Sequence, residues 1–295
     1  MDGLGWEALR NRDTPSRSTR RIELNKRILK PTSLPLHPAF KLNGLDFSSP
    51  EEVLNFTDDL LHEGNEQEVS VAQFIEKWLD FTEEVVVKTS GSTGSGTKAL
   101  LCIPADFIAG KMMVVRAMVL GWDLHVVQPA KDALVEYDND YDFVAMVPYQ
   151  VAHSLAALPK VKKVIIGGGT ISTTLEAQLQ DIDVEAFATY GMTETITHIA
   201  VRRINGFAKS EAYSALPDVK FSQDDRGCLL IHAPKISEEI VVTNDLVELK
   251  SPSSFVWQGR WDNVINSGGV KLFPEHVEAK LSDAIQLPFI IASEK

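Results

Sequence analysis

Short apolar runs alternate with longer helical stretches between residues 85 and 190, and this alternation restricts the fold most. The strand-length runs are rich in aliphatic and β-branched residues; they are Val85–Val87, Leu124–Val127, Phe143–Val147, Val164–Ile166 and Ala186–Thr189. The stretches with helical spacing are Asp106–Leu120 and Ile171–Leu179. Strands that alternate with helices form a mainly parallel sheet with helices on both faces. We therefore expect an α/β fold in which ligands bind beyond the carboxyl ends of the strands.

After about residue 210, short strand patterns follow one another without helix-length inserts. These patterns are Leu229–His232, Glu239–Thr243, Val247–Lys250 and Phe255–Trp257. They predict a small β-rich subdomain. A last helix is predicted over Pro274–Ala284, where apolar residues lie four apart.

Two capping signals predict helix starts nearer the N-terminus. Ser49 precedes Pro50 and stands three residues before Glu52, which is the pattern of a capping box. Ser70 and Gln73 repeat the signal, so we expect a second helix to begin there.

Composition excludes several classes of function and location. The formal net charge of −12 repels phosphate backbones, so we expect no nucleic-acid partner. The two cysteines, Cys102 and Cys228, cannot form a disulfide framework, which favours a cytoplasmic location. No apolar run reaches the roughly 18 residues of a membrane span, and the N-terminus lacks a signal-peptide segment. The Arg-rich residues 1–20 are expected to be disordered.

A run of Thr, Ser and Gly, Thr89 to Lys98, directly follows the apolar run Val85–Val87. Small residues let the backbone close around a polyanion, hydroxyls and N–H groups donate to phosphate oxygens, and Lys98 adds a positive charge. A solvated Ser/Gly loop is the alternative interpretation. The order GTK differs from the GK[ST] of an ordinary P-loop, which disfavours that class.

A second polar segment, Tyr190-Gly191-Met192-Thr193-Glu194-Thr195, follows the predicted strand at Ala186–Thr189. A carboxylate beside bound phosphates requires a cation between them, so Glu194 is predicted to be an oxygen ligand of Mg²⁺. The alternative is an ordinary turn.

These segments resemble motifs of the adenylate-forming superfamily, which includes acyl–CoA synthetases, peptide-synthetase adenylation domains and luciferase. The Thr89–Lys98 run looks like TSGSTGxPK, although Ser95-Gly96-Thr97 stands where two residues ending in Pro are expected. The Tyr190 segment is identical to YGMTET. Weaker matches follow in family order: Gly167-Gly168-Gly169 before it, then Thr243-Asn244-Asp245 (TGD, with Asn for Gly), Gly259 to Ile265 (GRxDxxI) and Ser267 to Lys271.

The resemblance implies a role for each matching residue. The residues implied to bind ATP or AMP are Thr89, Ser90, Gly91, Ser92, Thr93, Gly94, Gly168, Gly169, Tyr190, Gly191, Asp245 and Arg260. Tyr190 would pack on the adenine, and Asp245 and Arg260 would reach the ribose. The catalytic residues implied are Thr193, Glu194, Lys98 and Lys271. Asp262 would be the hinge between domains, and Gly268 and Gly269 would line the route of the coenzyme A thiol.

Longer stretches, such as AGKMMVVRAMVLGWDL and GRWDNVINSGGVKLFPEHVEAKL, are similar to the short o-succinylbenzoate–CoA ligases of menaquinone synthesis. A dicarboxylic acid needs a cationic or hydroxyl-lined pocket for its second carboxylate. The candidates for this pocket are Lys111, Arg116, Thr197 and His198. Packing or surface roles for His198 are an alternative.

The resemblance also divides the chain. Residues 21–210 form the nucleotide- and acyl-binding core, 211–260 the β-rich subdomain, and 261–295 the hinge and the start of a C-terminal lid. Superfamily members carry a lysine on that lid, and only a short segment follows Lys271, so we expect the lid to be largely absent and the chain to be truncated.

The implied activity is ATP-dependent formation of an acyl adenylate, followed by transfer of the acyl group to coenzyme A, with Mg²⁺ as the metal. The expected partners are a small carboxylic acid, ATP and coenzyme A, together with a second copy of the chain as a homodimer. The alternatives are activation of another aryl acid, or an adenylate-binding core without turnover.

Overall fold

The computed structural model describes residues 36–80, 94–135, 139–281, 284–285 and 289–292. Three predictions fall outside the described residues. They concern the expected disordered start at 1–20, the strand Val85–Val87 and the first five residues of the Thr/Ser/Gly run, 89–93. Within the described part of the chain, no helix is long and apolar enough to cross a membrane.

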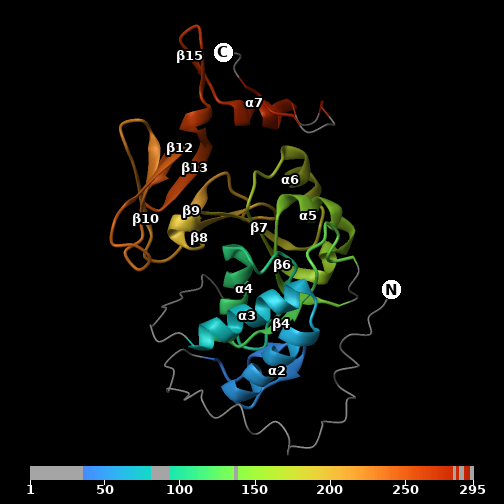
Figure 1. Cartoon of the computed structure of the whole chain (residues 1–295). Coiled ribbons are helices and arrows are strands. Elements are labelled where there is room, and N and C mark those ends of the chain that lie inside the picture. The colour runs from blue at the N-terminus through green and yellow to red at the C-terminus, as the bar shows by residue number, and fades with distance from the viewer. Residues whose placement is uncertain (1–35, 81–93, 136–138, 282–283, 286–288, 293–295) are drawn as a thin grey trace, which may run out of the picture. The chain divides into compact units, whose positions relative to one another are not determined.

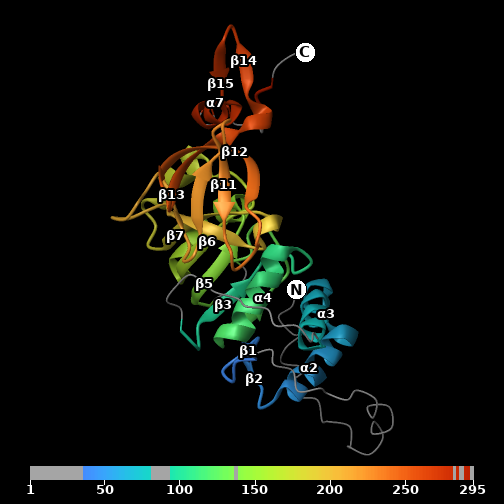
Figure 2. The same cartoon turned by 90° about the vertical axis from the view of Figure 1, so that its left-hand side faces the viewer.

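One sheet of 13 strands organises the described residues (Figures 1 and 2). Its order is β10-β11-β12-β13-β9-β8-β7-β6-β5-β3-β4-β1-β2. The strands of the parallel half, with the short β2, are β1 Lys41–Leu42, β2 Leu45–Asp46, β3 Lys98–Leu101, β4 Asp123–Val126, β5 Tyr141–Met146, β6 Val161–Ile166 and β7 Glu185–Gly191. Pairing from β1 through β4, β3, β5 and β6 to β7 is parallel. The expected α/β fold is confirmed.

Helices lie on both faces of this parallel half. They are α2 Pro50–Glu63, α3 Glu66–Asp80, α4 Ile108–Leu120, α5 Pro148–His153 and α6 Thr173–Leu179, with a 3₁₀ turn η2 at Leu155–Lys160. Leu175 and Leu179 of α6 pack into one core with Val144 and Val164 of the sheet. α4 lies beside α3 on the other face (Figures 1 and 2). Its residues 112–118 are all buried, which suits a helix that is apolar on every side.

The β-rich part continues the same sheet. Its strands are β8 His198–Arg203, β9 Tyr213–Ala215, β10 Lys220–Gln223, β11 Cys228–His232, β12 Val241–Ser251 and β13 Ser254–Arg260, and all pair antiparallel. They share a second core that includes Phe221, Leu229, Val247 and Phe255. The subdomain predicted from the strand pattern is therefore joined to the parallel half by hydrogen-bonded strands.

Two predictions of element limits are wrong. Ser70 does not begin a helix, because it lies inside α3 and its hydroxyl donates to Asp106 Oδ1 at 2.9 Å. Asn65 and Glu68 form the capping box instead, through Glu68 N to Asn65 Oδ1 at 3.0 Å and Asn65 N to Glu68 Oε2 at 2.9 Å. The two strands predicted around Asn244-Asp245 are the single strand β12, because these polar residues find partners without a turn.

The last elements are η4 Trp261–Asn263, the hairpin of β14 Ile265–Ser267 and β15 Val270–Leu272, and α7 Pro274–Leu281. Gly268 and Gly269 form the two-residue turn with φ of 57° and 86°. Positive φ at both positions defines a type I′ turn, which matches the twist of the flanking strands.

Candidate functional site

The carboxyl ends of β6 and β7 carry two of the polar segments singled out in the sequence. The glycine segment Gly167–Gly169 follows β6, and a Cβ at Gly167 would lie 2.4 Å from Thr189 Oγ1 on β7. Only glycine therefore allows the two strand ends to approach this closely. Gly168 has a φ of +75°, which a side chain would also oppose.

Tyr190 and Asp245 meet beside this strand edge, although they lie on β7 and β12. The Tyr190 hydroxyl donates to Asp245 Oδ2 at 2.6 Å. Burial and the neighbouring Asp245 raise the pKa of Tyr190, so the phenol stays protonated and donates. The Tyr190 ring packs edge-to-face on Phe255, with the ring centroids 5.0 Å apart. The structure therefore brings together the predicted adenine and ribose residues.

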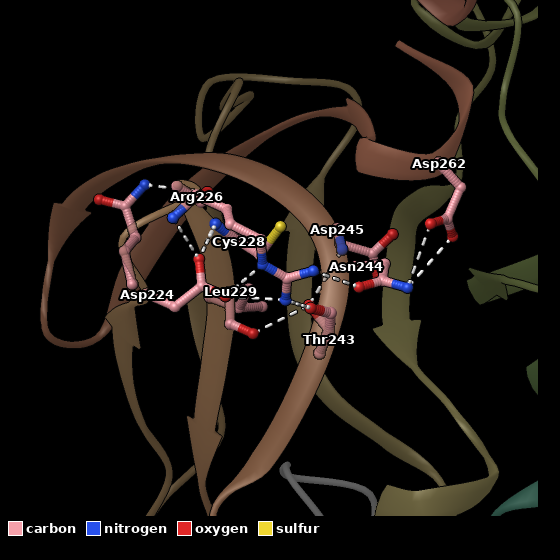
Figure 3. Close-up of polar contacts among 10 residues, drawn as sticks. Asp224, Arg226, Cys228, Leu229, Thr243, Asn244, Asp245 and Asp262 are labelled. Carbon is pink, nitrogen blue, oxygen red and sulfur yellow. Dashed lines mark hydrogen bonds and ion pairs between the residues drawn. The ribbon is translucent and has the colours of Figure 1, made fainter.

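Asp245 is held by β12 and its neighbours (Figure 3). The Thr243 hydroxyl donates to the Leu229 carbonyl of β11 at 2.9 Å and accepts from Asp245 N at 3.0 Å. The Trp257 indole donates to Asp245 Oδ1 at 3.2 Å. Asp245 is only 8% exposed, so its carboxylate has few routes to solvent.

A chain of polar contacts links this strand to the predicted hinge (Figure 3). Arg226 donates to Asp224 at 2.8 Å and to Asn244 Oδ1 at 2.9 Å. Asn244 Nδ2 donates in turn to the Asp262 carboxylate at 3.2 and 3.3 Å. Arg260 also donates to Asp262, at 3.2 Å, and this bond raises the pKa of the guanidinium. Arg260 lies opposite Asp245 in the β12–β13 ladder, so hinge and ribose residues are neighbours.

The turn after Tyr190 has a strained backbone. Ile196 has φ 61° and ψ −50°, and Thr197 N donates to the Thr195 carbonyl at 2.6 Å. This is a γ-turn with positive φ, which is rare for a β-branched residue. The fully buried Thr195 holds it by donating to the Thr197 carbonyl at 2.9 Å. Thr193 and Glu194, in η3 Thr193–Thr195, are left exposed to solvent.

Three of the four residues predicted for a carboxylate pocket lie together; they are Arg116, Thr197 and His198. Arg116 Nη2 donates to Thr197 Oγ1 at 3.0 Å and lies 3.4 Å from His198 Nδ1. Burial lowers the pKa of Arg116 to about 10, so it stays charged at neutral pH. Burial and Arg116 lower the pKa of His198 to about 3, so the imidazole is neutral and can accept a hydrogen bond.

A mainly apolar pocket of about 120 Å³ adjoins this group. Met112 and Val115 of α4 line it, as do Thr197, His198 and Leu216. The fourth predicted residue, Lys111, is partly exposed and does not line this pocket. Arg116 itself does not line the pocket, but it contacts two residues that do, Thr197 and His198.

Lys98 is not brought to this site. It begins β3, so it lies at the amino ends of the parallel strands, whereas Gly167–Gly169 and Tyr190 lie at the carboxyl ends. Its Nζ donates to Asn139 Oδ1 at 2.9 Å. Gly94 lines an open cleft of about 370 Å³ at the same amino-end edge, with Asp142 and Lys162. The direction of β3 thus contradicts the expectation that Lys98 reaches the same phosphates as Glu194.

Two residues of the site, Trp257 and Arg226, were not predicted from the sequence. Trp257 lies in a predicted strand without any polar signal, and Arg226 lies in a turn, so neither pattern marked a ligand site.

Gly268, Gly269 and Lys271 lie on the β14–β15 hairpin. Among the described residues, no three His, Cys, Asp or Glu side chains gather as a metal cage. A single exposed carboxylate such as Glu194 still suits Mg²⁺, which binds one or two carboxylates together with substrate phosphates.

Comparison with known proteins gives relatives of one kind, although no protein-family model matches the chain. A 2-succinylbenzoate–CoA ligase of Enterococcus faecalis is 23% identical over 217 residues, which are 62% of this chain and 45% of that enzyme. The chain thus spans about half the length of this curated relative. The crystal structure of an acyl-CoA synthetase (AMP-forming)/AMP-acid ligase II-like protein from Dyadobacter fermentans is 35% identical, with a TM-score of 0.63. The match covers 78% of this chain and 75% of that one.

A more distant match shares the fold. The o-succinylbenzoate coenzyme A synthetase of Bacillus subtilis, in complex with ATP and magnesium ion, is 19% identical with a TM-score of 0.55, over 65% of this chain and 47% of that one. The Dyadobacter match is similar enough in sequence and coverage to define the family, and it agrees with the motifs at Tyr190, Asp245 and Arg260. The chain belongs to the AMP-forming acyl-CoA synthetases of the adenylate-forming superfamily.

Proposed function

We propose that the chain binds ATP, activates a carboxylic acid as an acyl adenylate and transfers the acyl group to coenzyme A. The contact between Tyr190 and Asp245 at 2.6 Å is the observation that supports this most. It joins two motifs 55 residues apart, at the strand edge where α/β sheets bind ligands.

Each residue of this edge has a defined task in the proposal. Asp245 accepts hydrogen bonds from the ribose hydroxyls, which suits an ionised carboxylate. Gly168 and Gly169 leave room for the adenine beside Tyr190. Mg²⁺, when bound by Glu194 and the phosphates, neutralises charge on the polyphosphate.

Acyl transfer is proposed to follow at the same edge. The carboxylate of the acid attacks the α-phosphorus and pyrophosphate leaves; the thiolate of coenzyme A then displaces AMP. Thr193 contacts the α-phosphate, and positioning and charge neutralisation dominate the first step. Asp262 serves as the pivot, and the β14–β15 hairpin with Gly268, Gly269 and Lys271 borders the thiol route.

Arg116 supports an acid with a second carboxylate. Arg116 is 7% exposed, and no carboxylate of the described residues pairs with its guanidinium. A buried charge without an opposite charge beside it is costly, so an anionic group of the substrate is a fitting counterion for Arg116. The apolar wall of Met112 and Val115 suits an aromatic ring. We therefore propose o-succinylbenzoate as the acid, in preference to aryl acids with one carboxylate.

Calorimetry with AMP and with Mg·ATP tests the nucleotide site. Asp245→Asn should weaken both ligands by about 10- to 100-fold, because hydrogen bonds to a charged group contribute about 1.5–3 kcal/mol. Glu194→Gln should weaken Mg·ATP only, because AMP lacks the metal-bridged phosphates. Glu248→Gln, an exposed change on the same strand, is the matched control. Wild-type protein that binds neither nucleotide at millimolar concentration would refute the proposal.

Pyrophosphate release tests the acid. Release with o-succinylbenzoate should exceed release with benzoate, and Arg116→Gln should raise KM for o-succinylbenzoate by about 10-fold or more while leaving benzoate unaffected. An unchanged KM would show that Arg116 does not bind the second carboxylate of the acid. Nucleotide binding without pyrophosphate release for any acid would instead select an adenylate-binding core without turnover.

A further inference from the structure

Both oxygens of the Asp245 carboxylate carry a donor from the protein. Tyr190 donates to Oδ2 at 2.6 Å, and the Trp257 indole N–H donates to Oδ1 at 3.2 Å. Asp245 is 8% exposed, and its backbone N–H donates to Thr243 Oγ1. Two donors on opposite oxygens leave the side chain little freedom to rotate about its Cβ–Cγ bond.

A β-bulge brings Trp257 to this position. Asp245 pairs with Arg260 and Leu246 with Gly259, but Val247 pairs with Trp257, so Gln258 is an extra residue in β13. Directly opposed residues share a face, and residues two apart on a strand share a face. Trp257 therefore lies on the face of Val247 and Asp245. In a regular ladder Gln258 would oppose Val247, and Trp257 would point to the other face.

An ionised carboxylate offers about four lone-pair sites, of which Tyr190 and Trp257 occupy two. The sites that remain match in number the two hydroxyls of a ribose. We propose that Trp257 is a positioning residue, whose indole N–H turns the Asp245 carboxylate so that its free lone pairs meet both ribose hydroxyls of an adenine nucleotide. This inference rests on the proposed function and adds a residue to it.

The test compares AMP with 2′,3′-dideoxy-AMP, which lacks both hydroxyls that Asp245 would accept. Calorimetry on the full chain gives the ratio of the two affinities for wild type and for Trp257→Phe. The variant keeps an aromatic ring and loses only the N–H side of the indole. We expect it to weaken AMP by about 5- to 10-fold, less than the loss of a hydrogen bond made directly to the ribose because the effect is indirect, and dideoxy-AMP by less than about twofold. The binding of dideoxy-AMP also reports that the variant is folded.

Two further variants sharpen the result. In an Asp245→Asn background, Trp257→Phe should have a much smaller effect on AMP, because the coupling passes through the carboxylate. Trp122→Phe is the matched control: its indole N–H is buried without a hydrogen-bond partner among the described residues, and its ring lies beside Phe143. It should leave the ratio of affinities unchanged.

The outcomes separate this inference from the proposed function. Equal weakening of AMP and dideoxy-AMP by Trp257→Phe would show a packing role and overturn the inference alone. Tighter binding of AMP would also overturn it, because the indole would then compete with the ribose. Wild-type protein that binds neither nucleotide would overturn the proposed function and the inference with it.

Discussion

At the scale of single residues, the acyl side of the site depends on two groups whose charges are set by burial. Arg116 keeps its charge although burial lowers its pKa to about 10. His198 stays neutral because burial and Arg116 both oppose a second positive charge. The neutral ring can therefore accept from the guanidinium, and the pair carries one net positive charge beside an apolar pocket.

This pair predicts a pH dependence of stability. The pKa of His198 is about 3 in the folded chain and near 6.5 when unfolded, so between these values the unfolded state binds the extra proton. The stabilisation is present above about pH 6.5 and is lost as pH falls, by up to about 1.4 kcal/mol per pH unit. Urea unfolding from pH 7 to 5 should show a smaller loss for His198→Gln. Equal slopes for the variant and the wild type would contradict this explanation.

At the scale of elements, helix starts depend on which polar residue reaches the free N–H groups. Of the two serines predicted to begin helices, Ser49 does cap one, with Glu52 N donating to Ser49 Oγ at 3.2 Å, and Ser70 does not. α3 begins earlier than its serine suggests because Asn65 and Glu68 satisfy each other's backbone N–H groups. The capping residue Asn65, five positions before Ser70, therefore sets the start of α3, although the pattern at Ser70 fits equally well in sequence.

Asn65→Ala should therefore lower the free energy of unfolding by about 1 kcal/mol, the usual loss for an N-cap. Ser70→Ala should change it by less than about 0.5 kcal/mol, because its hydroxyl contacts only a side chain at the surface. Chemical denaturation of both variants at one pH measures the difference. A larger loss for Ser70→Ala than for Asn65→Ala would restore the sequence-based helix start.

At the scale of the whole described unit, one curved sheet makes the site. Tyr190 on β7 and Asp245 on β12 are separated in the sheet by β8, β9 and β13. Four steps between flat strands would span about 19 Å. The hydrogen bond between their side chains therefore requires the sheet to curl, and the rings of Phe221, Phe255 and Tyr213 fill its inner side. The contact between Tyr190 and Asp245 therefore depends on the curvature of the sheet.

Because one sheet carries both cores, urea should unfold them together. Trp78 and Trp122 belong to the parallel half, and Trp257 and Trp261 to the β-rich part and the segment that follows it. A Trp257→Phe, Trp261→Phe variant and a Trp78→Phe, Trp122→Phe variant therefore report mainly on opposite halves. Adding Phe255→Ala to each should lower both midpoints by the same amount, with a loss of about 3–5 kcal/mol for a buried aromatic ring. Two separate fluorescence transitions, or a shift confined to one half, would show independent subdomains.

The sequence by itself determined the fold class and the family. Its apolar runs predicted the parallel strands β4, β5, β6 and β7, because burial on both faces demands continuous apolar residues, but they did not predict β1 or β3. The motifs at Tyr190, Asp245, Arg260 and Asp262 were predicted as one site, and the confirmed family supports that grouping. These are local signals, carried by residues adjacent in the chain, so they need no knowledge of what lies across the sheet.

Only the tertiary structure decided which predicted residues meet. Lys98 belongs to a motif match, yet the direction of β3 places it at the amino-end edge, away from Tyr190. Lys111 and Arg116 looked equivalent, but only Arg116 reaches Thr197 and His198. The bulge at Gln258 turned Trp257 toward Asp245 against the expected alternation. Long-range packing sets the direction of each strand, the face that each helix buries and the curvature of the sheet. No pattern of neighbouring residues in the sequence predicts them.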